Sequence, residues 1–262
     1  MSRRMHLAVR VDGVGGRAGF PVVEHLARTA ERGLFDFVLV AADEPVTVLD
    51  ALAAVTARTG LAATVDAAGG DPFDLVRRLA TLDGLSGGRA GWHVASGGAP
   101  RVDIVREVWE ADFAVPSSPQ GRPVVIVAGE SEDQREFAAA RADVLVTAYG
   151  PVAAGRALYT DVKRRLARYG REARELRVLA GCDGLGGAPA GVRAAELDAY
   201  VREEAADGFL LGSAGLEEFV DRVVPLLQER GAFRTEYEGA TLRSHLGLGA
   251  PAENGSGKGS RT

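Results

Sequence analysis

The chain lacks features on which several classes of protein depend. It contains a single cysteine, Cys182, so an internal disulfide is excluded and a reducing compartment is favoured. The four histidines show no ligand spacing, and one cysteine cannot complete a zinc cluster, so we expect no metal site. No run of about 18 apolar residues occurs, and we therefore expect no membrane span.

A surplus of basic residues is also missing. The formal net charge is -5 and the isoelectric point is about 5.5, which argues against nucleic acid as a partner, because such proteins usually carry a basic patch. The first ten residues have neither the apolar stretch nor the cleavage site of a secretory signal. We therefore expect a cytoplasmic protein.

The chain does contain a regular alternation of two patterns. Apolar runs of strand length occur at residues 6–11, 35–41, 60–65, 89–95, 123–128, 143–148, 176–180 and 208–211. A segment with helical apolar spacing follows each run, for example Tyr159, Val162 and Leu166 on one stripe. Near-continuous apolar strands are typical of parallel sheets that are covered on both faces. The alternation therefore predicts eight β-then-α units.

Eight such units favour an α/β protein with the (β/α)8 TIM-type barrel, of about 250 residues. A doubly wound open sheet is the alternative, because the number of strands alone does not exclude it. We expect one domain over residues 1–249. Residues 250–262 are rich in glycine and serine without apolar periodicity, and they are expected to form a disordered tail.

The barrel fold predicts where a site would lie. Active sites of such barrels form at the carboxyl ends of the strands, in the loops that lead to the helices. Polar residues at the predicted strand ends include Asp43, Asp66, His93 and Glu130. His93 is a candidate catalytic residue because imidazole transfers protons near neutral pH, although a packed or surface histidine is the commoner outcome. Asp66 is a candidate partner in acid–base chemistry.

The segment from Gly129 to Asp133 joins a predicted strand directly to a predicted helix. A helix N-terminus offers free backbone N–H groups and a partial positive charge, and Ser131 could add its hydroxyl, so the segment suits a phosphate group. The alternative is that Ser131 is an ordinary N-cap residue, with Glu132 and Asp133 favouring the first helical turn. These two acidic residues also oppose phosphate binding.

Four segments, in order along the chain, resemble one known family. They are AERGLFDFVLVAADEP (30–45), LATLDGLSGGRAGWHVASG (79–97), PQGRPVVIVAGESEDQREFAAARADVLVTA (119–148) and YEGATLRSHLGL (237–248). Together they are similar to the luciferase-like flavin monooxygenases, in the branch of the nitrilotriacetate and dibenzothiophene-sulfone monooxygenases. The segments cover much of the chain and are specific in combination.

The resemblance implies a barrel that is usually a homodimer. It also implies reduced FMN supplied by a partner flavin reductase, and insertion of oxygen from O2 into a small organic substrate. By the same resemblance the flavin-binding side of the barrel includes Asp43, the segment from Thr64 to Gly70, His93, and Gly129, Glu130 and Ser131.

The sequence departs from the family at several of these positions. His93 stands where an asparagine is usual, and the polar and aromatic run after the third strand is reduced to Asp-Ala-Ala-Gly-Gly at 66–70. Gln134 replaces the usual helix-opening glycine. Residues 96–119 lack most of a long insertion that, in the family, helps to hold the flavin phosphate. We therefore expect shortened loops after the strands, with less cover against water.

Three hypotheses follow from these observations. The first is a reduced-FMN-dependent monooxygenase with a small lid. The second is a flavin-free barrel that carries out acid–base chemistry on a natural-product-like substrate through Asp43, Asp66 or His93. The third is a non-catalytic protein that binds flavin or another ligand. Fold alone does not separate them, because barrels of this type host many reactions.

Overall fold

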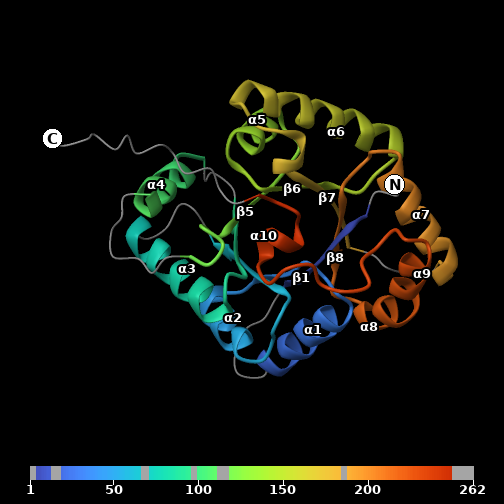
Figure 1. Ribbon diagram of the computed structural model, residues 1–262, viewed down its shortest axis with the longest axis horizontal. Helices are drawn as coiled ribbons and strands as arrows, with labels where there is room; N and C mark the ends of the chain where they lie inside the picture. Colours follow the sequence, from blue (N-terminus) through green and yellow to red (C-terminus); the bar gives the residue numbers. More distant parts are fainter. Residues whose placement is uncertain are drawn as a thin grey trace.

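The computed structural model describes residues 4–12, 19–65, 71–95, 99–110, 118–183 and 188–249. Eight parallel strands form a closed barrel in chain order, and β8 pairs with β1 (Figure 1). The strands are β1 (His6–Asp12), β2 (Phe37–Ala41), β3 (Gly60–Val65), β4 (Ala90–Val94), β5 (Val124–Ala128), β6 (Val144–Ala148), β7 (Arg177–Cys182) and β8 (Gly208–Gly212). The TIM-type barrel is thereby confirmed, and the open-sheet alternative is excluded by the pairing of β8 with β1.

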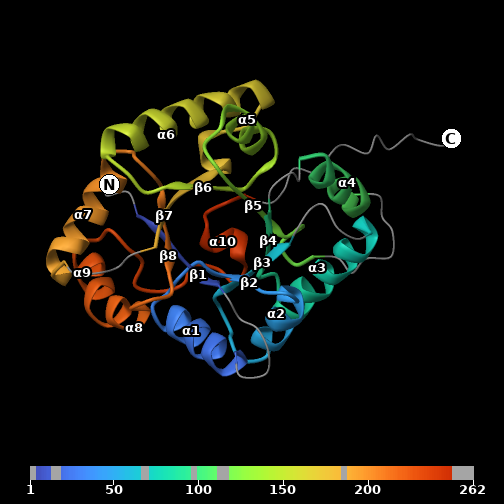
Figure 2. The same ribbon diagram turned by 180° about the vertical axis from the view of Figure 1, so that it is seen from behind.

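Helices follow the strands and form the outer layer of the barrel (Figures 1 and 2). They are α1 (Phe20–Arg32), α2 (Pro45–Ala53), α3 (Pro72–Ser86), α4 (Ala99–Glu110), α5 (Glu132–Arg141), α6 (Val152–Leu166) with η1 (Ala167–Tyr169) and η2 (Ala173–Glu175), α7 (Ala190–Arg202), and α8 (Leu216–Glu218), which continues through η3 (Phe219–Val223) into α9 (Val224–Glu229). None of the helices within the described ranges is long and apolar enough to cross a membrane.

The predicted strands agree with the observed ones to within two residues at each end. The differences of two residues are at the start of β2 and at the end of β7, which continues to Cys182. The apolar run was expected to start at residue 35, but β2 begins at Phe37. Leu34 has a positive φ of 60°, which ends the preceding turn, and Phe35 is buried edge-on against Phe219 in the helical layer. Phe35 is therefore part of the core between sheet and helices, and not of the strand. The expected tail at 250–262 lies outside the described residues.

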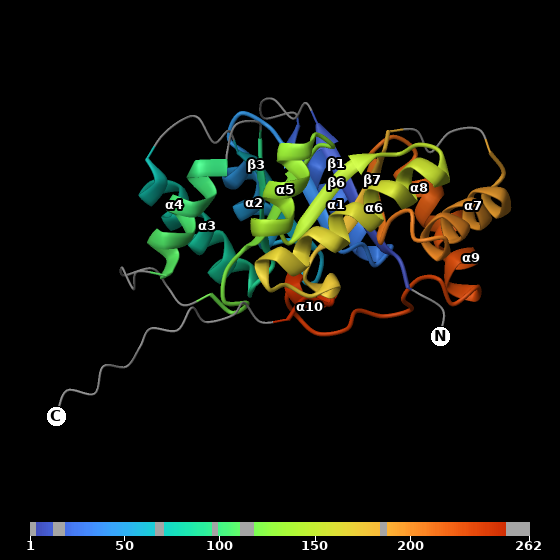
Figure 3. The same cartoon turned by 90° about the horizontal axis from the view of Figure 1, so that it is seen from above.

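The barrel interior is apolar and is closed at the end where the strands begin. A short helix, α10 (Leu242–His245), lies across this end (Figure 3). Leu242, Leu246 and Leu248 pack against inward side chains of the strands, such as Phe37 and Val144. Burial of this apolar layer leaves the opposite end, where the strands stop, as the open mouth of the barrel.

Buried ion pairs join the closing segment to the barrel. Arg243 of α10 donates to Asp143 at 2.8 Å, and Arg122 donates to the same carboxylate at 2.9 Å. Burial raises the pKa of Asp143, but the two guanidinium groups outweigh it and bring the pKa to about 2. Arg234 pairs with the fully buried Asp36 in a similar way. These carboxylates therefore remain charged and, through Arg234 and Arg243, tie the C-terminal segment to the barrel.

Candidate active site

The mouth of the barrel has a polar part and a part lined by small residues. Side chains alternate between the interior and the helical layer along a strand, and the interior cluster fixes which set points inward. The last inward residues, in strand order, are Asp12, Ala41, Thr64, His93, Ala128, Ala148, Gly181 and Gly212. Five of these eight positions hold alanine or glycine, so the floor of the mouth is open over β5 to β8.

The polar part contains two of the residues expected from sequence, His93 and Thr64. They are register partners on β4 and β3, and Nδ1 of His93 lies 3.2 Å from Oγ1 of Thr64. Among the described residues, the second ring nitrogen, Nε2, has no hydrogen-bond partner. The threonine thus orients the ring and leaves one nitrogen for a ligand.

Burial lowers the pKa of His93, and the nearby positive charge of Arg10 lowers it further. The imidazole is therefore neutral at pH 7. In this state it can accept a proton or a hydrogen bond through one nitrogen and donate through the other.

Arg10 is a residue of the mouth that the sequence analysis missed. It is an inward residue of β1, and it donates to Asp12 at 2.7 Å and to Asp183, after β7, at 2.8 Å. Both carboxylates are more than half exposed, so these pairs are weak and a ligand can compete for the guanidinium. Arg10 lies within an apolar run, and only the alternation of its neighbours Val9 and Val11 shows that it points inward.

The other expected residues lie differently. Asp43 is exposed just after β2, and its neighbour Glu44 pairs with Arg78 at 2.7 Å. Asp66 lies outside the described residues, so its expected role stays a prediction. Cys182 is buried at the end of β7, as expected of a small apolar side chain.

The start of α5 holds the remaining expected residues, and here the N-cap interpretation is confirmed. The hydroxyl of Ser131 accepts from the N–H of Gln134 at 3.2 Å, and Oε1 of Gln134 accepts from the N–H of Ser131 at 3.0 Å. This reciprocal pair is a capping box. Gly129 precedes it with a φ of 135°, a conformation that favours glycine. Glu130 accepts from the N–H of Ala148 at 2.7 Å.

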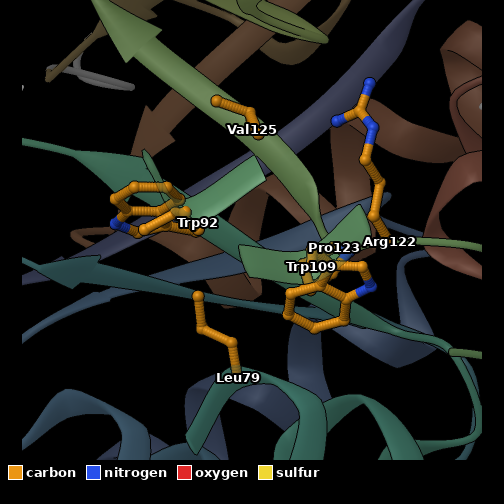
Figure 4. A pocket seen from close by; sticks show the side chains of 7 residues that line it. Leu79, Trp92, Trp109, Arg122, Pro123 and Val125 are labelled. Atoms are coloured by element: carbon orange, nitrogen blue, oxygen red, sulfur yellow. The ribbon is translucent and has the colours of Figure 1, made fainter. Parts of the chain in front are cut away.

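Two other cavities occur in the described part of the chain, besides a surface hollow on α6. One lies outside the barrel between α3, α4 and β5, where Trp92 and Trp109 face an apolar space of about 20 Å³ (Figure 4). Such a volume holds about one water molecule. The other, about 230 Å³, lies at the closed end of the barrel beside His6, Arg177 and His245. Neither lies at the mouth. No group of side chains within the described residues is arranged to hold a metal ion.

Comparison with known proteins agrees with this architecture. Residues 5–108 and 101–183 match the family described as luciferase-like monooxygenase. Nitrilotriacetate monooxygenase component A from Aminobacter aminovorans is 27% identical, over 86% of this chain and 89% of its own length. Dibenzothiophene-sulfone monooxygenase from Rhodococcus erythropolis is 24% identical, with coverages of 88% and 90%. The structure of EDTA monooxygenase from Chelativorans sp. BNC1 superposes with a TM-score of 0.84 at 20% identity, covering 95% of this chain and 99% of that one.

The alignments also show a difference in length. The match to the nitrilotriacetate enzyme runs over 405 positions, although this chain has 262 residues, so a large part of the relative has no counterpart here. This agrees with the expectation of shortened segments between the elements of the barrel.

Proposed function

The chain belongs to the luciferase-like monooxygenase family, and from this premise we propose that it is a reduced-FMN-dependent monooxygenase acting on a small organic substrate. The flavin would supply two electrons to O2, so that one oxygen atom enters the substrate and the other leaves as water. The observation that carries the proposal is the shape of the mouth. Alanine or glycine is the last inward residue of five strands on its floor, and the polar side chains of Arg10, Thr64 and His93 come from β1, β3 and β4.

This arrangement fits the ring system of a flavin. Small side chains at Ala128, Ala148 and Gly181 leave room for a planar group above the barrel interior. His93 would form a hydrogen bond with the polar edge of the ring or hold a proton beside the substrate, and Thr64 would keep the imidazole in place. Neutral imidazole suits both roles because it carries one donor and one acceptor.

The remaining contacts are proposed from the resemblance. Asp43, Gly129, Glu130 and Ser131 would contact the flavin from the ends of β2 and β5, and Asp66 would take part in proton transfer. The start of α5, however, does not fit a phosphate group, because its capping residues already use the amides and hydroxyl that a phosphate requires. We also propose a flavin reductase as partner and a homodimer as the active form.

The test is an anaerobic titration of the purified protein with reduced FMN, followed by absorbance or calorimetry. Saturable binding in the micromolar range or tighter is expected, and His93→Ala should weaken it. A matched control is His25→Ala, since His25 lies on the exposed surface of α1. Absence of binding at a large excess of reduced FMN would contradict the proposal.

A flavin-free acid–base enzyme is the second candidate. It is favoured by the partly buried, neutral His93 beside Thr64, together with a helix start that does not fit a phosphate. This candidate predicts turnover without flavin, lost in His93→Ala. Reductase-coupled oxygen uptake that depends on added FMN would decide against it.

A further inference from the structure

We infer that this chain recognises a flavin by its ring system and not by its terminal phosphate, so that it binds riboflavin about as tightly as FMN. The inference rests on the proposed function and specifies the cofactor class that the mouth accepts. The inference depends on the start of α5, which lies next to the part of the mouth lined by small residues. There the side chain of Gln134 occupies the position that a phosphate would need.

Two backbone amides and the serine hydroxyl at the start of α5 are already hydrogen-bonded. The N–H of Ser131 is bonded to the side chain of Gln134, and the N–H of Gln134 is bonded to the hydroxyl of Ser131. A phosphate binds at such a position through free backbone N–H groups. It would therefore have to break the capping box before it could form equivalent bonds.

The side chain of Gln134 also occupies the space above Gly129. A Cβ atom built on Gly129 would lie 2.1 Å from both Cδ and Oε1 of Gln134, so the carboxamide packs directly on the glycine backbone. Glycine at this point would otherwise allow a ligand to approach the main chain closely. Here the chain's own carboxamide takes that place.

The negative charge at the start of α5 also disfavours the binding of a phosphate. Two further backbone amides of the first turn lie outside the capping box. They belong to Glu132 and Asp133, whose exposed carboxylates lie beside them. Arg165 lies 3.6 Å from Glu132 and offsets only part of this charge, because the same guanidinium binds Glu136 and Asp161. A terminal phosphate carries nearly two negative charges at pH 7 and would be repelled.

The part of the mouth that would hold the flavin ring offers its contacts to the ring and not to the phosphate. Thr64 and His93 present their polar groups from β3 and β4, and the alanine and glycine residues of β5 to β8 form the floor. A phosphate at the start of α5 would meet the bonded amides of the capping box and the carboxylates of Glu132 and Asp133, so it adds little to the binding of a ligand held by its ring. FMN and riboflavin, which share the ring and the ribityl chain, should thus bind alike.

The experiment is an anaerobic equilibrium titration with reduced FMN and with reduced riboflavin, using the intact chain and two variants. The wild-type dissociation constants should agree within about threefold, which corresponds to less than 1 kcal/mol. Gln134→Gly opens the helix start and should tighten FMN about fivefold to tenfold relative to riboflavin. Gln134→Glu is the matched control, because it preserves the capping box but adds a negative charge, and it should not favour FMN.

The outcomes separate the inference from the proposed function. Wild-type protein that binds FMN more than about tenfold tighter than riboflavin overturns the inference and leaves the monooxygenase proposal standing. Failure to bind either flavin overturns both. An unchanged preference in Gln134→Gly, with the variant folded by circular dichroism, overturns the role assigned to Gln134.

Discussion

The Nδ1 atom of His93 lies 3.2 Å from the Oγ1 atom of Thr64, because the two residues are register partners on β4 and β3. A register partner on a neighbouring parallel strand points the same way, so both side chains enter the mouth of the barrel. The pair places a partly buried imidazole at the end of the barrel where such folds perform chemistry. Its protonation state is therefore the first property of the site to measure.

The first prediction concerns the pKa of His93. Burial and the charge of Arg10 both lower it, so we expect a value below the ordinary 6.5. Arg10→Met removes a positive charge and should raise the pKa, but not to 6.5, since burial remains the larger cause. NMR titration of the imidazole C–H signals measures the pKa of His93 in the wild type and in Arg10→Met. The signals are assigned by their loss in His93→Gln. In the control variant Arg77→Met, which removes an exposed arginine of α3, the pKa should not move. A lower pKa in Arg10→Met would be inconsistent with this account.

The second prediction concerns the contact between Gly129 and Gln134. Gly129→Ala places a methyl group on a residue with a positive φ and against the carboxamide of Gln134. The substitution should therefore destabilise the protein by about 1–3 kcal/mol. In the background of Gln134→Gly, the clash is absent and only the backbone strain remains. The cost of Gly129→Ala should then be smaller by about 1 kcal/mol.

Urea denaturation of the two single variants and the double variant gives the coupling energy between these residues. Gln134→Gly alone should cost about 1 kcal/mol through loss of the capping box. Additive effects of the two substitutions would show that Gln134 does not rest on Gly129 in solution. The same variants thus test the geometry on which the flavin preference depends, without a ligand.

The barrel was predictable from the sequence because its signal is repeated. Each strand is an apolar run followed by a segment of helical periodicity, and an error in one boundary, as at Phe35, does not alter the count of units. The pair of His93 and Thr64 was also within reach, because both precede predicted loops. Arg10 was missed because it lies inside an apolar run, where the alternation of Val9 and Val11 is a weak signal; its contacts with Asp12 and Asp183 place it at the mouth.

The start of α5 shows a different limit of sequence reasoning. The pattern at Ser131 was compatible with a phosphate site and with an N-cap, because both use the same hydroxyl and the same backbone amides. The choice depends on where the side chain of Gln134 turns, and a rotamer is set by three-dimensional neighbours such as Gly129. The ion pair between Arg243 and Asp143 could likewise not be predicted from the sequence, because one hundred positions separate its partners in the chain.

The third prediction concerns this ion pair at the closed end of the barrel. Asp143 accepts from Arg122, from Arg243 and from the N–H of Val125, and it is buried. Asp143→Asn leaves two guanidinium groups without their counter-charge and should lower the free energy of unfolding by about 3 kcal/mol. Chemical denaturation at pH 7 measures this. The control is Asp221→Asn, where an exposed aspartate pairs with Arg32 and the loss should stay below about 1 kcal/mol. Equal losses in the two variants would contradict the prediction.

The fourth prediction concerns His245, which stacks on Tyr237 with ring centroids 4.7 Å apart. Burial has the largest effect on this imidazole and lowers its pKa to about 4, although the carboxylate of Asp36 and the backbone at Gly239 favour the charged form. Between pH 6.5 and 4 the unfolded chain binds a proton at this residue and the folded chain does not, so stability falls as the pH falls. From pH 7.5 to pH 5 the loss from this residue should be about 2 kcal/mol.

His245→Phe isolates this contribution, because it preserves a ring against Tyr237 and removes the titrating group. At pH 7.5 the variant should be about as stable as the wild type, since a ring of similar size stays packed against Tyr237. At pH 5 it should exceed the wild type by about 2 kcal/mol in urea denaturation. Other groups titrate in both proteins and cancel in the difference. A parallel decline of the two proteins with pH would mean that His245 binds a proton as readily in the folded chain as in the unfolded chain, and it would contradict the prediction.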